Sequence, residues 1–339
     1  MTKSRSENVV YLPGLNGLRA IAAILVLIGH VTIPMYSDFS RLVYQFHPGF
    51  DGVTLFFVIS GFLITFLLLK EKKKTNDIDI KKFYIRRILR IWPIYYLFII
   101  SCLILALFFN KIQSIYSFEL VYYIFFAANV PFILQIATPI LTHYWSIGVE
   151  EQFYLFWPWF IKLVKNKIVP MTIVFFCFLF IIKLGARFIL GKEAIIYKVL
   201  VVSRFHCMLI GALGAMLFVN KNILFLKFFT NKWIHVFAWL IFILLSIEFV
   251  HIPAPIAPEI TSLVSLFLIV GQINASDSKK IINLEHNVFD FLGKISYGIY
   301  VIHPLVIMIL FYFLDELIVS KLIYTMKLFK VQNFKNKYA

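Results

Sequence analysis

The segment "LRAIAAILVLIGH", which runs from Leu18 to His30, decides the fold class because it is apolar along almost its whole length. The apolar run continues to Met35, and a membrane-spanning helix needs about 20 mostly apolar residues. The run is longer than the apolar region of a signal peptide, and no small-residue cleavage signal follows it. We therefore expect a retained first span, bracketed by the cation Arg19 and the imidazole His30.

Composition extends this expectation to the whole chain. Of the 339 residues, 61% are hydrophobic and only 15% are charged, which is more apolar side chain than a soluble domain of this size could bury. The sequence predicts an all-α, polytopic membrane bundle of about nine or ten transmembrane helices. Nine apolar runs have the required length: 18–36, 50–69, 91–109, 145–164, 168–190, 199–219, 233–250, 256–273 and 291–313.

Basic loops suggest how the chain is oriented. Lys and Arg outnumber Asp and Glu by 33 to 17, and they cluster between apolar runs, as in cytoplasmic loops that face anionic lipid. We therefore expect membrane lipid and no nucleic acid as a partner, with a cytoplasmic amino terminus. A further apolar run, 118–136, is interrupted by Asn129 and Pro131. The later basic loops stay on the cytoplasmic side only if this run is re-entrant or interfacial.

The chain is expected to form one membrane domain over residues 1–313. Residues 314–339 are weakly apolar and rich in Lys, so they are interpreted as a divergent or truncated carboxyl tail, or as a poorly formed tenth span. Cys102, Cys177 and Cys207 lie inside apolar runs without a CxxC spacing, so neither a disulfide framework nor a metal site is expected.

Arg19 and His30 form the first candidate pair. Eleven residues of helix turn through about three full turns and rise about 16 Å, so the two side chains share one face at different depths. One interpretation is a snorkelling arginine and a packed histidine. The other is functional, because imidazole can take a hydroxyl proton near neutral pH and ionisable groups within a span are costly. The spacing alone favours neither.

Two further blocks carry charge. The stretch "FYIRRILRIWPIYY", 83–96, places Arg86, Arg87 and Arg90 together on a helix, either as ordinary positive-inside anchors or as a cradle for phosphate oxygens. The stretch "HYWSIGVEEQFYLFWP", 143–158, places Glu150 and Glu151 within a span. An intramembrane acid needs either a structural ion pair, for instance with an arginine such as Arg204, or a functional role.

These blocks together resemble the membrane acyltransferase-3 family, the O-acetyltransferases of surface polysaccharides. The segment "GLRAIAAILVLIGH" resembles its Arg-x10-His signature, and the resemblance covers roughly residues 11–306. The sequence departs from the pattern at Thr54, where members commonly have Asp, at His206, where an Asp often stands, and after Phe313, where the final span is not recognisable. The other matching blocks follow in the expected order: "GVTLFFVISGFLIT", "RRILRIWPIYY", "HYWSIGVEEQFYLFWP" and "SYGIYVIHPLV".

The resemblance implies an enzyme of the bacterial cytoplasmic (inner) membrane. Such an O-acyltransferase transfers an acyl group, usually acetyl, from acyl-CoA on the cytoplasmic side. The acceptor is a hydroxyl of a cell-surface polysaccharide or lipopolysaccharide sugar, and no metal is expected. His30 would act either as a base or as a transient acyl carrier.

The candidate residues fall into three groups. The catalytic candidates are His30, Arg19, Glu150 and Glu151; the cofactor-binding candidates are Arg86, Arg87, Arg90 and Arg19; the substrate-binding candidates are Trp145, His143, Arg204 and His303. Two other functions stay open: a proton-coupled transporter whose buried His and Glu residues form a proton path, and an inactive or scaffolding paralogue.

Overall fold

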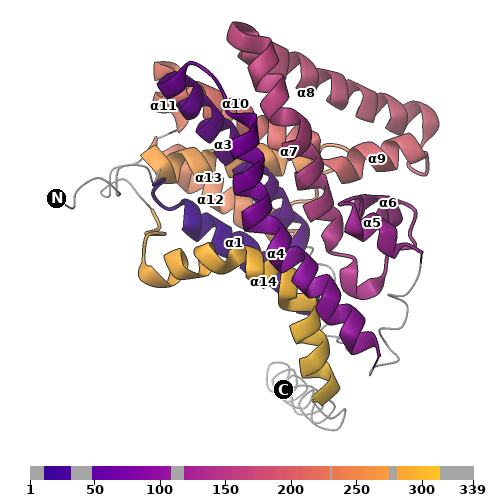
Figure 1. The fold of residues 1–339 in the computed structure, drawn as a ribbon. Helices are drawn as coiled ribbons and strands as arrows, with labels where there is room; N and C mark the ends of the chain where they lie inside the picture. Colours follow the sequence, from indigo (N-terminus) through magenta and orange to yellow (C-terminus); the bar gives the residue numbers. More distant parts are fainter. Residues whose placement is uncertain (1–10, 32–47, 108–117, 230, 275–280, 314–339) are drawn as a thin grey trace, which may run out of the picture.

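The structure, a computed structural model, describes residues 11–31, 48–107, 118–229, 231–274 and 281–313. Over these ranges the chain is helical and forms no strand, as the composition predicts (Figure 1). The predicted tail, 314–339, lies outside the described residues.

Six helical segments in the described part of the chain are long and apolar enough to cross a membrane. Four are the single helices α3 (Pro48–Thr75), α4 (Ile80–Ala106), α13 (Ala257–Asn274) and α14 (Asn287–Phe313). The fifth combines α9 (Ile195–Ser203) with α10 (Phe205–Val219), and the sixth begins with α7 (Tyr144–Val164) and α8 (Ile168–Gly185). The chain is therefore a polytopic helical membrane protein.

The remaining predicted spans also coincide with helices. The segment that contains α7 and α8 has 47 residues in all, far more than one crossing needs. It turns at η3 (Lys165–Lys167), where Lys165 has a positive φ, and ends in a π-helical turn, η4 (Ala186–Leu190). Helices α11 (Ile223–Phe229) and α12 (Lys232–Ser246) meet at a bend of 60°. The first predicted span is α1 (Leu15–Val31), which has 17 residues.

The interrupted run 118–136 does not form a crossing helix. It contains two five-residue helices, α5 (Leu120–Ile124) and α6 (Asn129–Ile133), and the short turn η2 (Pro139–Leu141) follows. Side chains of the neighbouring spans satisfy its irregular backbone, as buried polar groups within a membrane require. The Tyr95 hydroxyl donates to the Tyr123 carbonyl at 2.6 Å, and the Gln152 amide donates to the Phe126 carbonyl at 3.1 Å.

Helix α3 lies at the centre of the bundle and packs against α1 and α10. The α3–α10 contact depends on glycine: a Cβ built on Gly61 would lie 2.0 Å from the Met208 carbonyl oxygen. A Cβ on Gly211 would lie 2.1 Å from the Val58 carbonyl oxygen. Small residues let helix backbones approach closely where lipid offers no hydrophobic driving force between helices. This close crossing fixes the face of α3 that carries the polar site.

A buried ion pair joins α8 to α13. Lys183, which is only 1% exposed, pairs with Glu259, and His206 Nε2 lies 3.3 Å from the same carboxylate. Breaking such a pair would leave an uncompensated buried charge. The pair therefore anchors α8 to the bundle, although most of α8 faces outward.

Candidate active site

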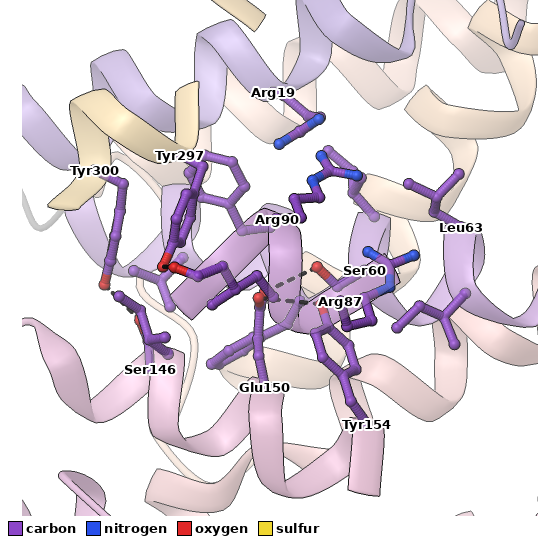
Figure 2. A pocket seen from close by; sticks show the side chains of 17 residues that line it. Arg19, Ser60, Leu63, Arg87, Arg90, Ser146, Glu150, Tyr154, Tyr297 and Tyr300 are labelled. Carbon is purple, nitrogen blue, oxygen red and sulfur yellow. Dashed lines mark hydrogen bonds between the residues drawn. The ribbon is translucent and has the colours of Figure 1, made fainter. Parts of the chain in front are cut away.

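A pocket opens between α1, α3, α4, α7 and α14 (Figure 2). It holds about 720 Å³ of empty space, a volume that includes space open to solvent. Its wall is mostly apolar, with a few polar groups that converge from different helices. The polar lining residues are Arg19, Ser60, Arg87, Arg90, Ser146, Glu150, Tyr154, Tyr297 and Tyr300.

Three guanidinium groups gather on one side of this pocket. Arg19 comes from α1, and Arg87 and Arg90 come from successive turns of α4 (Figure 2). Arg90 is exposed whereas Arg19 and Arg87 are half-buried, so the cluster lies where the pocket opens. Among the described residues, no carboxylate lies within 4 Å of any of the three. We call these three residues the arginine cluster.

Arg86, the third arginine of the predicted cradle, lies elsewhere. Its guanidinium pairs with Glu71 at 3.0 Å, and the side chain is 56% exposed. Arg86 does not line the pocket, because consecutive residues of a helix point about 100° apart. Of the four predicted cofactor-binding residues, the structure therefore brings Arg19, Arg87 and Arg90 together and leaves Arg86 outside.

Glu150 lies in the middle of the pocket. Its carboxylate accepts hydrogen bonds from the Ser60 hydroxyl at 2.8 Å and the Tyr154 hydroxyl at 3.1 Å (Figure 2). Glu151 points to another side of α7, where the Trp92 indole donates to it at 3.2 Å and where it does not line the pocket. Neither acid pairs with Arg204 in the described structure, so hydroxyl and indole donors replace the ion pair that was one alternative.

His30 lies beside two other histidines. Its ring centroid is 4.7 Å from that of His303 on α14, and the His303 centroid is 5.1 Å from that of His143, which precedes α7. Both contacts are edge to face, and His143 and His303 are buried. Two predicted substrate-binding residues thus lie together with the predicted catalytic histidine, and we call the three the histidine cluster.

Ser146 and Tyr300 connect the pocket to the histidine cluster. Both line the pocket, and their hydroxyl oxygens are 2.5 Å apart (Figure 2). The Tyr300 hydroxyl also donates to the His143 carbonyl at 2.9 Å, and the Tyr300 carbonyl accepts from His303 Nδ1 at 2.7 Å. These contacts therefore link two pocket-lining residues to His143 and His303, and through the His303 ring to His30.

Sequence reasoning did not single out Ser146, Tyr154, Tyr297 or Tyr300, although a signal was present. Ser146, Glu150 and Tyr154 recur every four residues, which places them on one face of α7. Tyr300 precedes His303 by three residues, which is also a same-face spacing. The sequence could not assign these hydroxyls to the site, because their hydrogen-bond partners lie on neighbouring helices.

Trp145 and Arg204 form a separate contact that does not line the pocket. The Arg204 guanidinium lies over the Trp145 ring at 5.6 Å and donates to the Thr54 hydroxyl at 2.7 Å and the Phe50 carbonyl at 3.3 Å. Arg204 itself has a positive φ where α9 meets α10. The two remaining substrate-binding candidates are thus neighbours of each other.

The pocket combines an anion-binding end, an apolar wall and a path to imidazole. Guanidinium groups bind phosphate oxygens with fork geometry, so the arginine cluster suits a phosphate-bearing ligand. A neutral imidazole with a free ring nitrogen can take a proton from a hydroxyl. Within the described residues, no group of three or more His, Cys, Asp or Glu side chains has the arrangement of a metal site.

Comparison with known proteins gives an independent result. The O-acetyltransferase OatA of Staphylococcus aureus (strain NCTC 8325 / PS 47) is 36% identical over 202 residues, which is 55% of this chain and 32% of that protein. The peptidoglycan O-acetyltransferase OatA of Listeria monocytogenes is 34% identical over 178 residues, 48% of this chain and 27% of that protein. The match thus spans about a third or less of each relative.

No solved structure matches this chain. The family comparison, in contrast, covers nearly the whole chain. The family described as an acyltransferase domain matches residues 12–329, a range that contains the pocket and the histidine cluster. This agrees with the resemblance carried by the Arg-x10-His block and the blocks that follow it. The chain belongs to the acyltransferase-3 family of membrane proteins.

Proposed function

We propose that this chain transfers an acetyl group from acetyl-CoA to a hydroxyl of a cell-surface polysaccharide, from a position in the bacterial cytoplasmic membrane with its amino terminus in the cytoplasm. The observation that carries the proposal is the continuity of the site. Three guanidinium groups without a carboxylate partner among the described residues line a pocket whose wall includes Ser146 and Tyr300, and Tyr300 is hydrogen-bonded to two members of the histidine cluster.

The arginine cluster is proposed to bind the phosphates of coenzyme A. Cations near the mouth of an apolar pocket attract a polyanion and fix its position, while the apolar wall suits the thin, uncharged arm that carries the thioester. Glu150 is proposed to place a negative charge beside the cluster, beyond ion-pair distance, because its carboxylate is held by hydrogen bonds from Ser60 and Tyr154 on the same pocket wall.

His30 is proposed to be the general base. Its Nδ1 lies 2.9 Å from the Val26 carbonyl, which can only accept a hydrogen bond, so Nδ1 carries the proton and Nε2 is bare in the neutral ring. The acceptor oxygen forms a bond to the thioester carbonyl carbon, the C–S bond breaks, and coenzyme A leaves as the thiolate. The hydroxyl proton moves to Nε2, from which it can return to the thiolate.

The acceptor is proposed to be a sugar of the cell surface, and peptidoglycan is the first one to test. The support is the relative from Listeria monocytogenes, which is named a peptidoglycan O-acetyltransferase. Lipopolysaccharide is the other acceptor expected from the sequence, and an assay of both glycans separates the two.

The test replaces His30 by Ala in the full chain, produced in a bacterial host that lacks this modification. We expect acetyl groups, released from purified glycan by mild alkali, to fall at least about 100-fold, since a general base contributes 10²–10⁴-fold. His235→Gln is the matched control, because His235 is buried on α12 and lies against Gly271, far from the pocket lining. Acetylation by H30A at the parent level, with equal protein in the membrane, would show that His30 is not the base.

A further inference from the structure

The three rings of the histidine cluster are each held in one tautomer by a backbone carbonyl. His30 Nδ1 and His303 Nδ1 lie 2.9 Å and 2.7 Å from the carbonyls of Val26 and Tyr300. His143 Nε2 lies 3.0 Å from the carbonyl of Val301. Because carbonyls accept, these three nitrogens must be the donors, which leaves the opposite nitrogen of each neutral ring as an acceptor.

Two of these acceptors are buried. Within the described residues, no donor reaches His303 Nε2 or His143 Nδ1, and both atoms are inaccessible. Both histidines are only 3% exposed. Buried polar atoms are normally paired, and an orphan in a native structure marks a site with a missing partner. The neighbouring ring of His303 is His30, whose centroid is 4.7 Å away at an interplanar angle of 72°.

We propose that His303 is a positioning residue for His30: its bare Nε2 accepts a hydrogen bond from His30 when His30 has taken the acceptor proton. This inference rests on the proposed function and names the partner of its base. The proton that His30 removes from the hydroxyl is the donor that His303 lacks, so the orphaned nitrogen becomes paired during the reaction and not before it.

The hydrogen bond from protonated His30 to His303 matters because this region is poorly solvated. An imidazolium in a mostly buried site is unstable unless a partner accepts its proton. A charge-assisted hydrogen bond that develops as the proton arrives on His30 stabilises the imidazolium and the transition state that leads to it. The ground state lacks this bond, so it raises kcat and leaves substrate binding unchanged. His143 keeps the His303 ring in place from its other side, with ring centroids 5.1 Å apart.

The experiment compares His303→Leu with His303→Gln in full-length protein in proteoliposomes. Coenzyme A release from acetyl-CoA is followed with soluble peptidoglycan fragments as the probe acceptor. For H303L we expect kcat to fall about 10- to 100-fold, with KM for acetyl-CoA within about twofold of the parent value. Gln can present an amide oxygen near the position of Nε2, so H303Q is expected to recover most of kcat. His235→Leu and His235→Gln are the matched pair, since His235 Nε2 is also buried without a partner but lies on α12.

The outcomes separate this inference from the proposed function. If H303L turns over like the parent while H30A is inactive, His303 does not assist His30 and the proposed function stands. If H303L and H303Q lose activity equally, or if KM for acetyl-CoA rises with the loss, the role of His303 is structural. If the parent chain releases no coenzyme A either with peptidoglycan fragments or with lipopolysaccharide, the proposed function fails and this inference fails with it.

Discussion

At the scale of single residues, two buried cations are stabilised in different ways. Lys183 has a carboxylate partner in Glu259, whereas Arg204 relies on the Thr54 hydroxyl and the Phe50 carbonyl within the described structure. A guanidinium tolerates this because it is weakly hydrated and stacks on aromatic rings. Thr54 stands where the family resemblance predicts an acid, and its hydroxyl accepts a hydrogen bond from Arg204 at 2.7 Å.

The Thr54 hydroxyl is therefore expected to stabilise the fold. Thr54→Val removes the acceptor and leaves a buried donor unpaired, which costs about 1–3 kcal/mol. The apparent unfolding temperature in detergent should fall by roughly 2–8 °C. Thr172→Val is the matched control, because the Thr172 hydroxyl bonds mainly to the Ile168 carbonyl of its own helix. An equal effect of the two substitutions would mean that the Arg204 contact does not stabilise the protein.

The residues of the site were only partly predictable. The spacing of Arg19 and His30 predicts a shared face at two depths; in the structure Arg19 lines the pocket and His30 contacts His303. It could not reveal that Arg86 turns away to Glu71, or that Ser146 meets Tyr300. Both depend on which neighbouring helix a side chain faces, and that is decided by tertiary packing.

At the scale of helices, hydropathy located the spans but not their ends. The predicted span 50–69 is part of a helix that continues to Thr75, and the predicted span 91–109 begins eleven residues earlier, at Ile80. Helix ends are set by capping and not by apolarity: the Asp79 carboxylate accepts from the Lys82 backbone amide at 2.9 Å and starts α4. The charged turns thus extend the helices beyond the apolar core.

The close α3–α10 crossing predicts a sharp difference between two glycines. Gly61→Ala would place a Cβ 2.0 Å from a backbone oxygen of α10, so the helices must separate and the unfolding temperature should fall by several degrees or more. A Cβ on Gly185 of α8 meets nothing within 4 Å. Gly185→Ala should be neutral or slightly stabilising, because Ala favours a helix by about 1 kcal/mol. Scanning fluorimetry of the two purified variants checks this, and similar midpoints would contradict the described crossing.

At the scale of the whole molecule, the site exists only in the assembled bundle. Arg19, Ser60, Arg87, Glu150 and Tyr300 come from α1, α3, α4, α7 and α14, and no two of these helices alone contain the path (Figure 1). The sequence could name the polar residues within the spans, since each is costly there. The sequence could not show which of these residues are neighbours in the site, because that depends on how the helices pack.

The central claim is that the arginine cluster binds the phosphates of the acyl donor, and equilibrium binding of radiolabelled acetyl-CoA to the purified full chain tests it most directly. We predict saturable binding by the parent. Losing one charge-assisted contact in Arg87→Ala or Arg90→Ala should raise Kd about 10- to 100-fold. Arg86→Ala should change Kd less than about threefold, because Arg86 is an exposed residue paired with Glu71. Binding that does not saturate, or that Arg86→Ala weakens as much as Arg87→Ala, would contradict the account.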